Sequence, residues 1–295
     1  MSARRVAICI ATRNRAAELE RLLESLASLE IPRGVDASVL IVENADPHDG
    51  APPACALPCT RVFEPRVGIP YARNRAIGEA ARQADFIAFL DDDETVDPRW
   101  LQAALAAIDA TGAAIATGPA LPRFPHDAPA WAARSGAYEP VRYTQHAPRP
   151  FAYTNNVIFR STIARGEGAP RLDESLEFTG GSDKEFFARL ARQGHLIVWA
   201  DDAVTYEWYP RSRLRRRWLF QRAMRLGTVA RRTDGASRPS MALGALRFLA
   251  RGAVRAAGHV LDPASATALL AWDVGRACGL VLGAIGIRYH EYRGR

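Results

Sequence analysis

Four consecutive acidic residues, Asp91 to Glu94, are the residues of this 295-residue sequence best placed to do chemistry. They follow the apolar run at 85–90, which predicts a buried strand, and in open α/β sheets ligands bind at the carboxyl ends of strands. Carboxylates this close repel one another, and a hard divalent cation with oxygen ligands relieves that repulsion. Because alternate residues of an extended chain face opposite ways, Asp91 and Asp93 can share one side. The run therefore predicts a divalent-cation site.

The alternative is that the acidic run is a solvated turn or a cap for the next helix. Asp97 followed by Pro98 already supplies an N-cap and a first-turn proline for a helix over 99–110. Gly112 then closes that helix. A capping role for the run itself is therefore disfavoured.

The elements that must position these carboxylates alternate between strand and helix patterns over the first 120 residues. Short apolar runs predict strands at 5–11, 37–42, 60–63, 85–90 and 113–118, and helical spacing predicts helices at 19–29, 70–83 and 99–110. This alternation predicts an α/β fold with a parallel sheet covered by helices.

The rest of the chain changes character twice. An irregular, Pro- and aromatic-rich connection at 119–150 precedes a strand at 151–159, a helix at 183–193 and a strand at 195–200. From residue 213 the pattern is helical, in three segments broken at 235–239 and at 262–263. We therefore expect an α/β domain over 1–210 and a helical C-terminal region over 211–295, basic and then apolar.

The charge of the chain is concentrated in one place. The net charge is +7 with a pI of about 9.6, Lys184 is the only lysine, and arginines are densest at 211–232. Leucines and aromatics lie among these arginines, which suits a helix that docks on protein and exposes its cations to anionic lipid. A solvated charged face is the alternative. We expect contact with an anionic membrane to be peripheral.

The sequence also indicates location. The four cysteines, at 9, 55, 59 and 278, lack the spacing of a zinc site, and a disulfide scaffold is not expected. The apolar run at 6–11 is shorter than a signal-peptide core. The apolar run at 268–287 contains Asp273 and Arg276, each costing roughly 2.5 to 3.5 kcal/mol at a bilayer centre. We therefore expect a cytoplasmic protein without a transmembrane helix.

Several short motifs occur in one order along the chain. They are ICIATRNR at 8–15, VLIVENAD at 39–46, GIPYARNRAIGEA at 68–80, FLDDDE at 89–94 and GGSDKEFFARL at 180–190. With these motifs in this order, the sequence resembles the glycosyltransferases of family 2 over about residues 4–230. The resemblance implies the GT-A fold, a Rossmann-like mixed sheet flanked by helices. It places a nucleotide-sugar half at 1–120 and an acceptor half at 121–210.

The resemblance also implies roles for individual residues. The pocket for the base and ribose would be lined by Ala11, Thr12, Arg13, Glu43 and Asn44, with Arg73 and Asp92 as further donor contacts. Asp91 would contact the ribose, or the metal through water, and Asp93 would bind the Mn²⁺ or Mg²⁺ that bridges the diphosphate. For Thr12 and Asn44 the alternative is turn chemistry. For Arg73 it is solvation.

The motif GGSDKEFFARL implies a general base. Members of the family present an acidic pair here whose second residue is the base, and this chain has Ser182 followed by Asp183. A carboxylate within reach of the acceptor hydroxyl can take its proton during attack. The alternative for Asp183 is a helix N-cap, and Glu185 is the reserve candidate, with a solvated helix face as its own alternative.

Other positions depart from the family or stay open. Tyr206 stands where the family often has a histidine metal ligand, so Glu207 or water would take that place. Asn155 and Asn156 would face the acceptor or the diphosphate, or hydrogen-bond their own loop. Trp208 and Tyr209 would form a stacking platform for the acceptor or pack as buried aromatics.

The predicted function is that of an inverting glycosyltransferase. It would move a sugar from a nucleoside diphosphate sugar, with a UDP-sugar favoured, to a hydroxyl of a saccharide or lipid-linked saccharide in bacterial cell-surface polysaccharide or glycolipid synthesis. It would work in the cytoplasm or on the cytoplasmic face of the inner membrane. The alternatives are a nucleotidyltransferase, whose Gly- and Lys-containing phosphate loop is missing from residues 11–17, and a non-catalytic basic module. Nucleic acid is not an expected partner.

Overall fold

The computed structural model describes residues 3–48, 53–177, 180–231 and 235–287. The chain divides into two compact units. The first consists of Met1–Leu121, Pro140–Glu177 and Ser182–Glu207, and the second of Pro122–Glu139, Phe178–Gly181 and Trp208–Arg295. The expected boundary at residue 210 stays a prediction, since the second unit also draws on two earlier segments.

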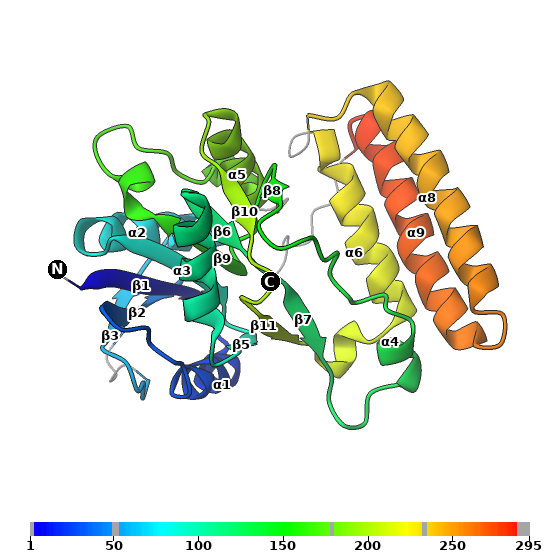
Figure 1. Ribbon diagram of the computed structural model, residues 1–295. Coiled ribbons are helices and arrows are strands. Elements are labelled where there is room, and N and C mark those ends of the chain that lie inside the picture. The colour runs from blue at the N-terminus through cyan, green and yellow to red at the C-terminus, as the bar shows by residue number, and fades with distance from the viewer. Residues whose placement is uncertain (1–2, 49–52, 178–179, 232–234, 288–295) are drawn as a thin grey trace. The chain divides into compact units, whose positions relative to one another are not determined.

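The first unit contains an eight-stranded mixed sheet (Figure 1). Its order is β3 (Cys59–Phe63), β2 (Val35–Glu43), β1 (Arg4–Thr12), β4 (Phe86–Asp91), β9 (Asn156–Arg160), β6 (Ile115–Thr117), β10 (Ile197–Trp199) and β8 (Pro148–Arg149). Strands β3, β2, β1 and β4 are parallel to one another, whereas β9 runs antiparallel to both of its neighbours. The mixed α/β sheet expected from the sequence is confirmed.

Helices cover both faces of this sheet because its strands are apolar on both sides. Ile8 and Ile10 of β1 pack in one core with α1 (Ala16–Leu26) and α3 (Trp100–Thr111). Ala7 and Cys9 pack in a second core with α2 (Ile69–Gln83) and α5 (Ser182–Arg192). Since successive side chains point to opposite faces, one strand supplies both cores. The result is three layers, with the carboxyl ends of the parallel strands at one edge.

A smaller three-stranded sheet was not predicted. Its order is β5 (Glu94–Val96), β11 (Thr205–Trp208) and β7 (Ala120–Arg123). Strand β5 pairs with β11 in antiparallel register, with Glu94 opposite Glu207. This pairing fixes the backbone that leaves the acidic run, and it draws Glu207 to the same place.

The predicted strand at 151–159 forms only from Asn156, so its first half was wrong. The register pairs Asn156 with Leu90, and β4 ends one residue later at Asp91. Continuing this register would place Asn155 opposite Asp91, so residues before Asn155 lie beyond the end of β4. The short η1 (Ser161–Ala164) and η2 (Glu174–Leu176) turns follow β9.

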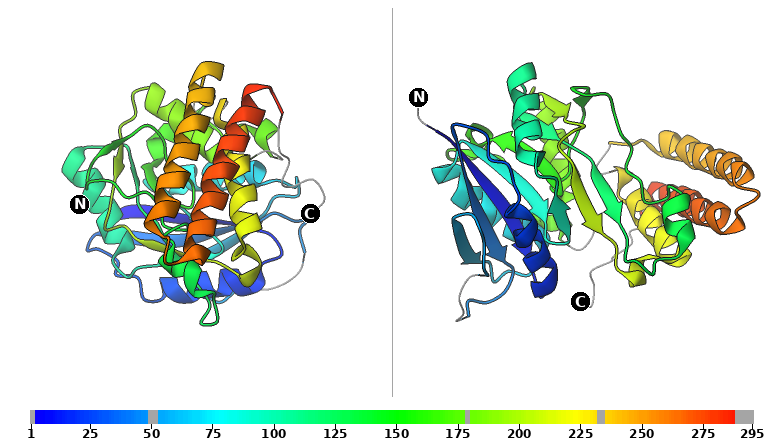
Figure 2. Two further views of the ribbon diagram at one scale, coloured as in Figure 1. Left: turned by 90° about the vertical axis from the view of Figure 1, so that its right-hand side faces the viewer. Right: turned by 60° about the horizontal axis from the view of Figure 1, so that its bottom comes forward.

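The second unit contains the helices α4 (Ala130–Arg134), α6 (Arg216–Thr228), α8 (Arg238–Gly258) and α9 (Pro263–Ala284), with a short η3 turn (Arg211–Arg213). Within it α9 lies between α6 and α8 (Figure 2). A Cβ on Gly275 or Gly279 would overlap the backbone carbonyls of Phe220 and Met224, so α6 and α9 approach backbone to backbone. In the part of the chain that the structure describes, α6, α8 and α9 lie in the three helical segments expected after residue 213.

The helix α9 is 22 residues long and is apolar enough, by length and composition alone, to cross a membrane. Part of its surface is buried against the rest of the unit, and a core helix of a soluble protein would pass the same test. The absence of a transmembrane helix therefore stays a prediction.

Candidate functional site

The parallel register brings the predicted donor residues to one edge of the sheet. Thr12 pairs with Glu43 across β1 and β2, and Ala11 pairs with Asp91 across β1 and β4. Each of these residues ends its strand or lies next to its end. The sheet therefore places four of the predicted site residues side by side.

Asp92 links the acidic run to the loop that follows β1. Its two carboxylate oxygens accept hydrogen bonds from Thr12 Oγ1 at 2.9 Å and from Arg15 Nη1 at 2.8 Å. The same Arg15 nitrogen lies 3.3 Å from Asp93 Oδ2. Burial raises the pKa of Asp92 to about 6, with the positive charge of Arg15 acting against it. The hydroxyl of Thr12, at the end of β1, is therefore held by a carboxylate of the acidic run.

Asp91 has a different cationic partner. Arg73, the fifth residue of α2, donates from Nη2 to Asp91 Oδ1 over 2.7 Å. Its side chain is only 7% exposed, so the alternative of a solvated arginine is wrong. Arg73 presents a fixed positive charge to the carboxylate at the end of β4.

Glu94 is the most deeply buried carboxylate of the run, at 1% exposure. One oxygen accepts from Asn155 Nδ2 at 3.1 Å and from Thr205 Oγ1 at 3.4 Å, and the other accepts from the Asp91 amide at 3.4 Å. Burial raises its pKa well above the usual value, and the negative charges of Asp91, Glu207 and Asp93 raise it further.

The crowded carboxylates of the acidic run are candidate ligands for a metal ion. No group of three or more His, Cys, Asp or Glu side chains arranged around a metal position occurs among the residues that the structure describes. The donor set nevertheless consists of carboxylate oxygens whose mutual repulsion is visible in the pKa of Glu94. Oxygen donors in this number are what Mg²⁺ and Mn²⁺ prefer. The carboxylate chemistry suits a hard divalent cation, and a metal site at the acidic run stays a prediction.

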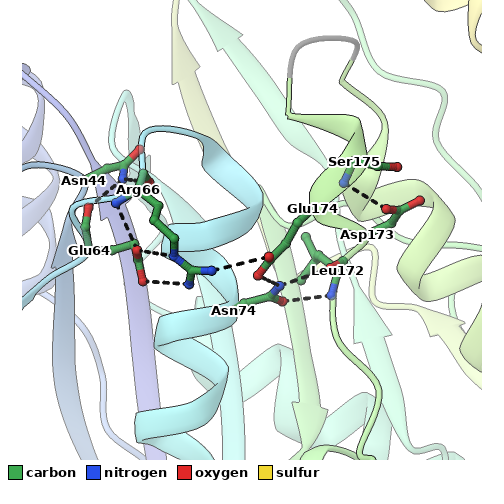
Figure 3. A network of polar contacts seen from close by, with 8 residues as sticks. All are labelled: Asn44, Glu64, Arg66, Asn74, Leu172, Asp173, Glu174 and Ser175. Carbon is green, nitrogen blue, oxygen red and sulfur yellow. Dashed lines mark hydrogen bonds and ion pairs between the residues drawn. The ribbon is translucent and has the colours of Figure 1, made fainter.

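Asn44 has a structural role at the end of β2. Its amide nitrogen donates to the carbonyls of Glu64 and Arg66, and its oxygen accepts from the Gly68 amide, all at 2.8 Å. Figure 3 shows this side chain turned into the loop that leads to α2. Turn chemistry, one of the two alternatives, thus accounts for Asn44, and it fixes the entry to the helix that carries Arg73.

The same network continues to the segment before α5. Arg66 contacts Glu64 at 2.8 Å and Glu174 at 3.4 Å, and Asn74 holds both backbone groups of Leu172 (Figure 3). A polar cavity of about 390 Å³ lies beside these residues. The network ties α2 to the chain that approaches the candidate base.

Two further predicted donor residues lie at the same edge but in different settings. Glu43 contacts His48 Nε2 at 3.0 Å and Arg61 at 3.6 Å. Arg13 is exposed in the loop after β1, next to Asn14, which has a positive φ of 54°. Their placement leaves the donor roles of both residues as predictions.

Asp183 lies in the first turn of α5 and accepts a hydrogen bond from the Lys184 amide at 2.7 Å. Glu185, the reserve base, is paired with Arg189 at 3.0 Å one helical turn later. Among the described residues, no hydrogen bond or ion pair joins Asp183 to the acidic run. Its role as base stays a prediction.

The remaining predicted positions divide by burial. Asn156 is buried and bonds Trp100 Nε1 and the carbonyls of Pro119 and Ala203, which is plain hydrogen bonding. Asn155 instead faces the acidic run through Glu94. Tyr209 is buried in an aromatic cluster with Phe124, Tyr138 and Trp218, so the buried-aromatic alternative is right for it.

Sequence reasoning missed Arg15 and Thr205 as parts of this site, and it gave Glu94 no role of its own within the acidic run. Arg15 was visible as the last residue of ICIATRNR, one turn after the first strand. Glu94 was visible as the fourth acid of the run. Thr205 gave no local signal, because only the pairing of β5 with β11 brings it to Glu94.

An α/β sheet with an acidic run beyond a central strand and a cationic turn beyond its neighbour is the arrangement expected of the GT-A class. Residues 7–168 match the glycosyl transferase family 2, which is more than half of the chain. A curated relative, the succinoglycan biosynthesis protein ExoM of Rhizobium meliloti (strain 1021), is 31% identical over 219 residues, or 72% of this chain and 70% of ExoM. The chain therefore belongs to glycosyltransferase family 2.

Solved structures agree on the fold. A mannosyltransferase from Pyrobaculum calidifontis, PcManGT, in complex with GDP-Man and Mn²⁺, matches with a TM-score of 0.59 at 17% identity over 96% of this chain and 88% of that one. S. aureus TarS 1-349 in complex with UDP-GlcNAc matches with a TM-score of 0.51 at 14% identity over 98% and 93%. At these identities the likeness shows the GT-A fold alone, and it confirms the predicted fold class.

Proposed function

We propose that this glycosyltransferase uses a nucleoside diphosphate sugar, with a UDP-sugar favoured, and transfers the sugar with inversion to a hydroxyl of a saccharide or lipid-linked saccharide. The observation that carries the proposal is the gathering of Asp91, Asp92, Asp93 and Glu94 at one strand end, beside Thr12 at the end of the neighbouring strand and Arg15 in the loop after it. The name of ExoM supports a place in the synthesis of a bacterial cell-surface polysaccharide or glycolipid.

The acidic run would hold Mn²⁺ or Mg²⁺ through Asp93 and Asp91, with Glu207 in the place of a histidine. PcManGT was solved with GDP-Man and Mn²⁺, which supports this assignment. When bound, the ion would neutralise negative charge on the departing diphosphate. Arg15 and Arg73 would keep the carboxylates oriented by the ion pairs already described.

The remaining residues proposed to contact the donor lie at the carboxyl edge of the sheet. Ala11, Thr12, Arg13 and Glu43 surround the ends of β1 and β2, where the base and ribose would lie. Asp92, bonded to Thr12 and Arg15, would fix the loop after β1 against the nucleotide.

Asp183 would accept the proton of the acceptor hydroxyl as that oxygen attacks the anomeric carbon. The bond to the diphosphate breaks as the bond to the acceptor oxygen forms, so one displacement inverts the anomeric centre. The position of Asp183 at the start of α5, after two glycines with positive φ, supports an approach of ligand to that backbone.

The catalytic work would lie in residues 1–210, and the helical region 211–295 would serve association with the cytoplasmic face of the inner membrane. Lipid-linked acceptors are presented at such a surface, and the concentration of arginines in this region supports the assignment.

The test is a donor screen with the purified 295-residue chain. Hydrolysis of each nucleoside diphosphate sugar is followed with Mn²⁺, with Mg²⁺ and with chelator, and products are identified by mass spectrometry. One nucleotide sugar should be turned over in the presence of a divalent ion and not in chelator. Equal turnover in chelator would remove the metal from the proposal, and no turnover of any donor would remove the sugar transfer.

A further inference from the structure

The outward face of α8 carries apolar side chains where a surface helix normally carries polar ones. Its buried face consists of Met241, Ala245 and Gly252. Exposed apolar residues then recur at steps of three and four, namely Leu243, Leu246, Ala250, Ala253 and Ala257, with Leu249 and Val254 beside them. We call this set, together with the turn residues below, the α8 apolar face. It is directed away from the core of its own helical unit.

The apolar surface continues past the end of α8. Val260 is 73% exposed and Leu261 is 97% exposed, in the turn that joins α8 to α9. Side chains of this size are exposed singly on most proteins, but a contiguous apolar surface marks an interaction site. The turn and the helix together offer one such surface.

The charges beside this face have a single sign. The sequence of α8 contains Arg238, Arg247, Arg251 and Arg255 and no acidic residue. Arg251 and Arg255 are ion-paired with Asp273, which is completely buried on α9. These pairs draw Arg251 and Arg255 toward α9, whereas Arg238 and Arg247 are exposed along α8. The expected partner is therefore apolar at its centre and anionic at its margin.

This pattern separates α8 from the other basic helix. In α6 and the turn before it, Leu214 and Leu219 are buried, and Trp218 packs in the aromatic cluster of its unit. The expectation from the sequence had placed the lipid contact on the arginines at 211–232. The apolar side chains that such a contact needs are exposed on α8 instead.

The charge pattern also separates an anionic bilayer from a second copy of the chain. Two copies of α8 packed face to face would bring arginines toward arginines, with no carboxylate on either helix to compensate. A helix that lies in the surface of an anionic bilayer buries its apolar face roughly 5 to 10 Å deep, below the headgroups. Arginine side chains beside an apolar stripe can contact the apolar layer with their methylene groups and the headgroups with their guanidinium groups.

We propose that the α8 apolar face and the Val260–Leu261 turn insert into the headgroup boundary of an anionic phospholipid bilayer, with the exposed Arg238 and Arg247 contacting lipid phosphates. The inference deepens the membrane association within the proposed function by naming the surface that makes it. The contact is interfacial and does not require α9 to span the bilayer.

The experiment is cosedimentation of the 295-residue chain with vesicles, without donor or acceptor. One set is made of phosphatidylcholine containing phosphatidylglycerol and the other of phosphatidylcholine alone. The variants Leu246→Glu and Leu261→Glu place a carboxylate at two separate points of the proposed surface. Val141→Glu, which changes an equally exposed apolar side chain of the first unit, is the matched control.

We expect the parent to bind the anionic vesicles. Each of the two α8-face variants should bind roughly tenfold more weakly, since each loses one apolar side chain that would be buried in the bilayer. Arg247→Ser should weaken binding by roughly fivefold, and only to the anionic vesicles. Val141→Glu should bind as the parent does. Thermal unfolding of each variant confirms that its fold is retained.

Three results would overturn the inference. The first is that the parent does not bind anionic vesicles. The second is that Leu246→Glu and Leu261→Glu bind them as tightly as the parent does. The third is that the parent is a dimer in solution whereas the Leu246→Glu variant is a monomer. The last would make a second copy the occupant. Because the assay uses no sugar donor, its failure leaves the proposed reaction intact, and an inactive enzyme can still bind vesicles.

Discussion

Arg15 donates a hydrogen bond of 2.8 Å from Nη1 to Oδ1 of Asp92, although the two residues are 77 positions apart. The contact joins the loop after β1 to the acidic run after β4. Asp92 is 5% exposed, so the carboxylate resists ionisation despite its cationic partner. The cost of ionising it should therefore appear in the stability of the protein.

The first prediction concerns pH. Burial raises the pKa of Asp92 in the folded protein from 3.8 to about 6. An acid whose pKa is raised by folding contributes stability below its unfolded pKa, and this contribution is lost as the pH rises through the folded value. As the pH rises from about 4 to about 6, ionisation of Asp92 should therefore lower the unfolding free energy by about 3 kcal/mol.

Urea unfolding of the parent and of Asp92→Asn in chelator, at pH 4 and pH 7, measures this cost. The unfolding free energy of Asp92→Asn, relative to that of the parent, should be higher at pH 7 than at pH 4. Asp36→Asn, at an exposed position on β2, controls for the loss of one charge. A difference that stays constant with pH would mean that Asp92 is ionised as easily as a solvated aspartate.

The second prediction concerns the metal. Asp93→Ala should abolish the stabilisation that Mn²⁺ and a nucleoside diphosphate together give, because that carboxylate would bind the ion directly. A ligand at a hundred times its dissociation constant stabilises by about 2.7 kcal/mol, which thermal unfolding resolves easily. Asp109→Ala removes an exposed carboxylate paired with Arg4 and should keep the full effect. A normal Mn²⁺ response in Asp93→Ala would move the ligand role to another carboxylate.

Most of the first unit could be predicted because its signals are local. The continuous apolar run of β1 and the leucine spacing of α1 fix both elements within a few residues of their observed bounds. The small sheet of β5, β11 and β7 could not be predicted, since its three- and four-residue strands are too short to show a period. Its pairing depends on contacts between distant parts of the chain.

The site divides in the same way. The acidic run and Thr12 were found from their place at strand ends, and the parallel register brings them together. The ion pair of Arg73 with Asp91 was not among the alternatives for Arg73, which were a nucleotide contact and solvation, because it depends on the burial of Arg73 in the folded chain. Asn44 resembled a donor contact in sequence, and only its three backbone partners reveal the structural role.

The third prediction concerns packing of α9 against α6. Gly279 has no room for a Cβ beside the carbonyl of Met224, and that neighbour is backbone, which cannot rotate away. Gly279→Ala should therefore lower the unfolding free energy by about 3 kcal/mol. Gly258→Ala, at the open end of α8, should instead stabilise by about 0.4 to 1 kcal/mol. Equal unfolding free energies for the two variants would show that α6 and α9 are separated more widely.

The last prediction concerns the chemistry of transfer. Asp183→Asn keeps the shape of the side chain and can still accept from the Lys184 amide, but it cannot take a proton from the acceptor hydroxyl. Turnover should fall on the order of 10² to 10⁴, with little change in donor affinity, since the base faces the acceptor. Glu185→Gln is the matched control, because its carboxylate is occupied by Arg189. NMR of the product should show that an α-linked donor gives a β-linked sugar. A retained anomer would contradict the single displacement, and a fully active Asp183→Asn enzyme beside an inactive Glu185→Gln would transfer the role of base to Glu185.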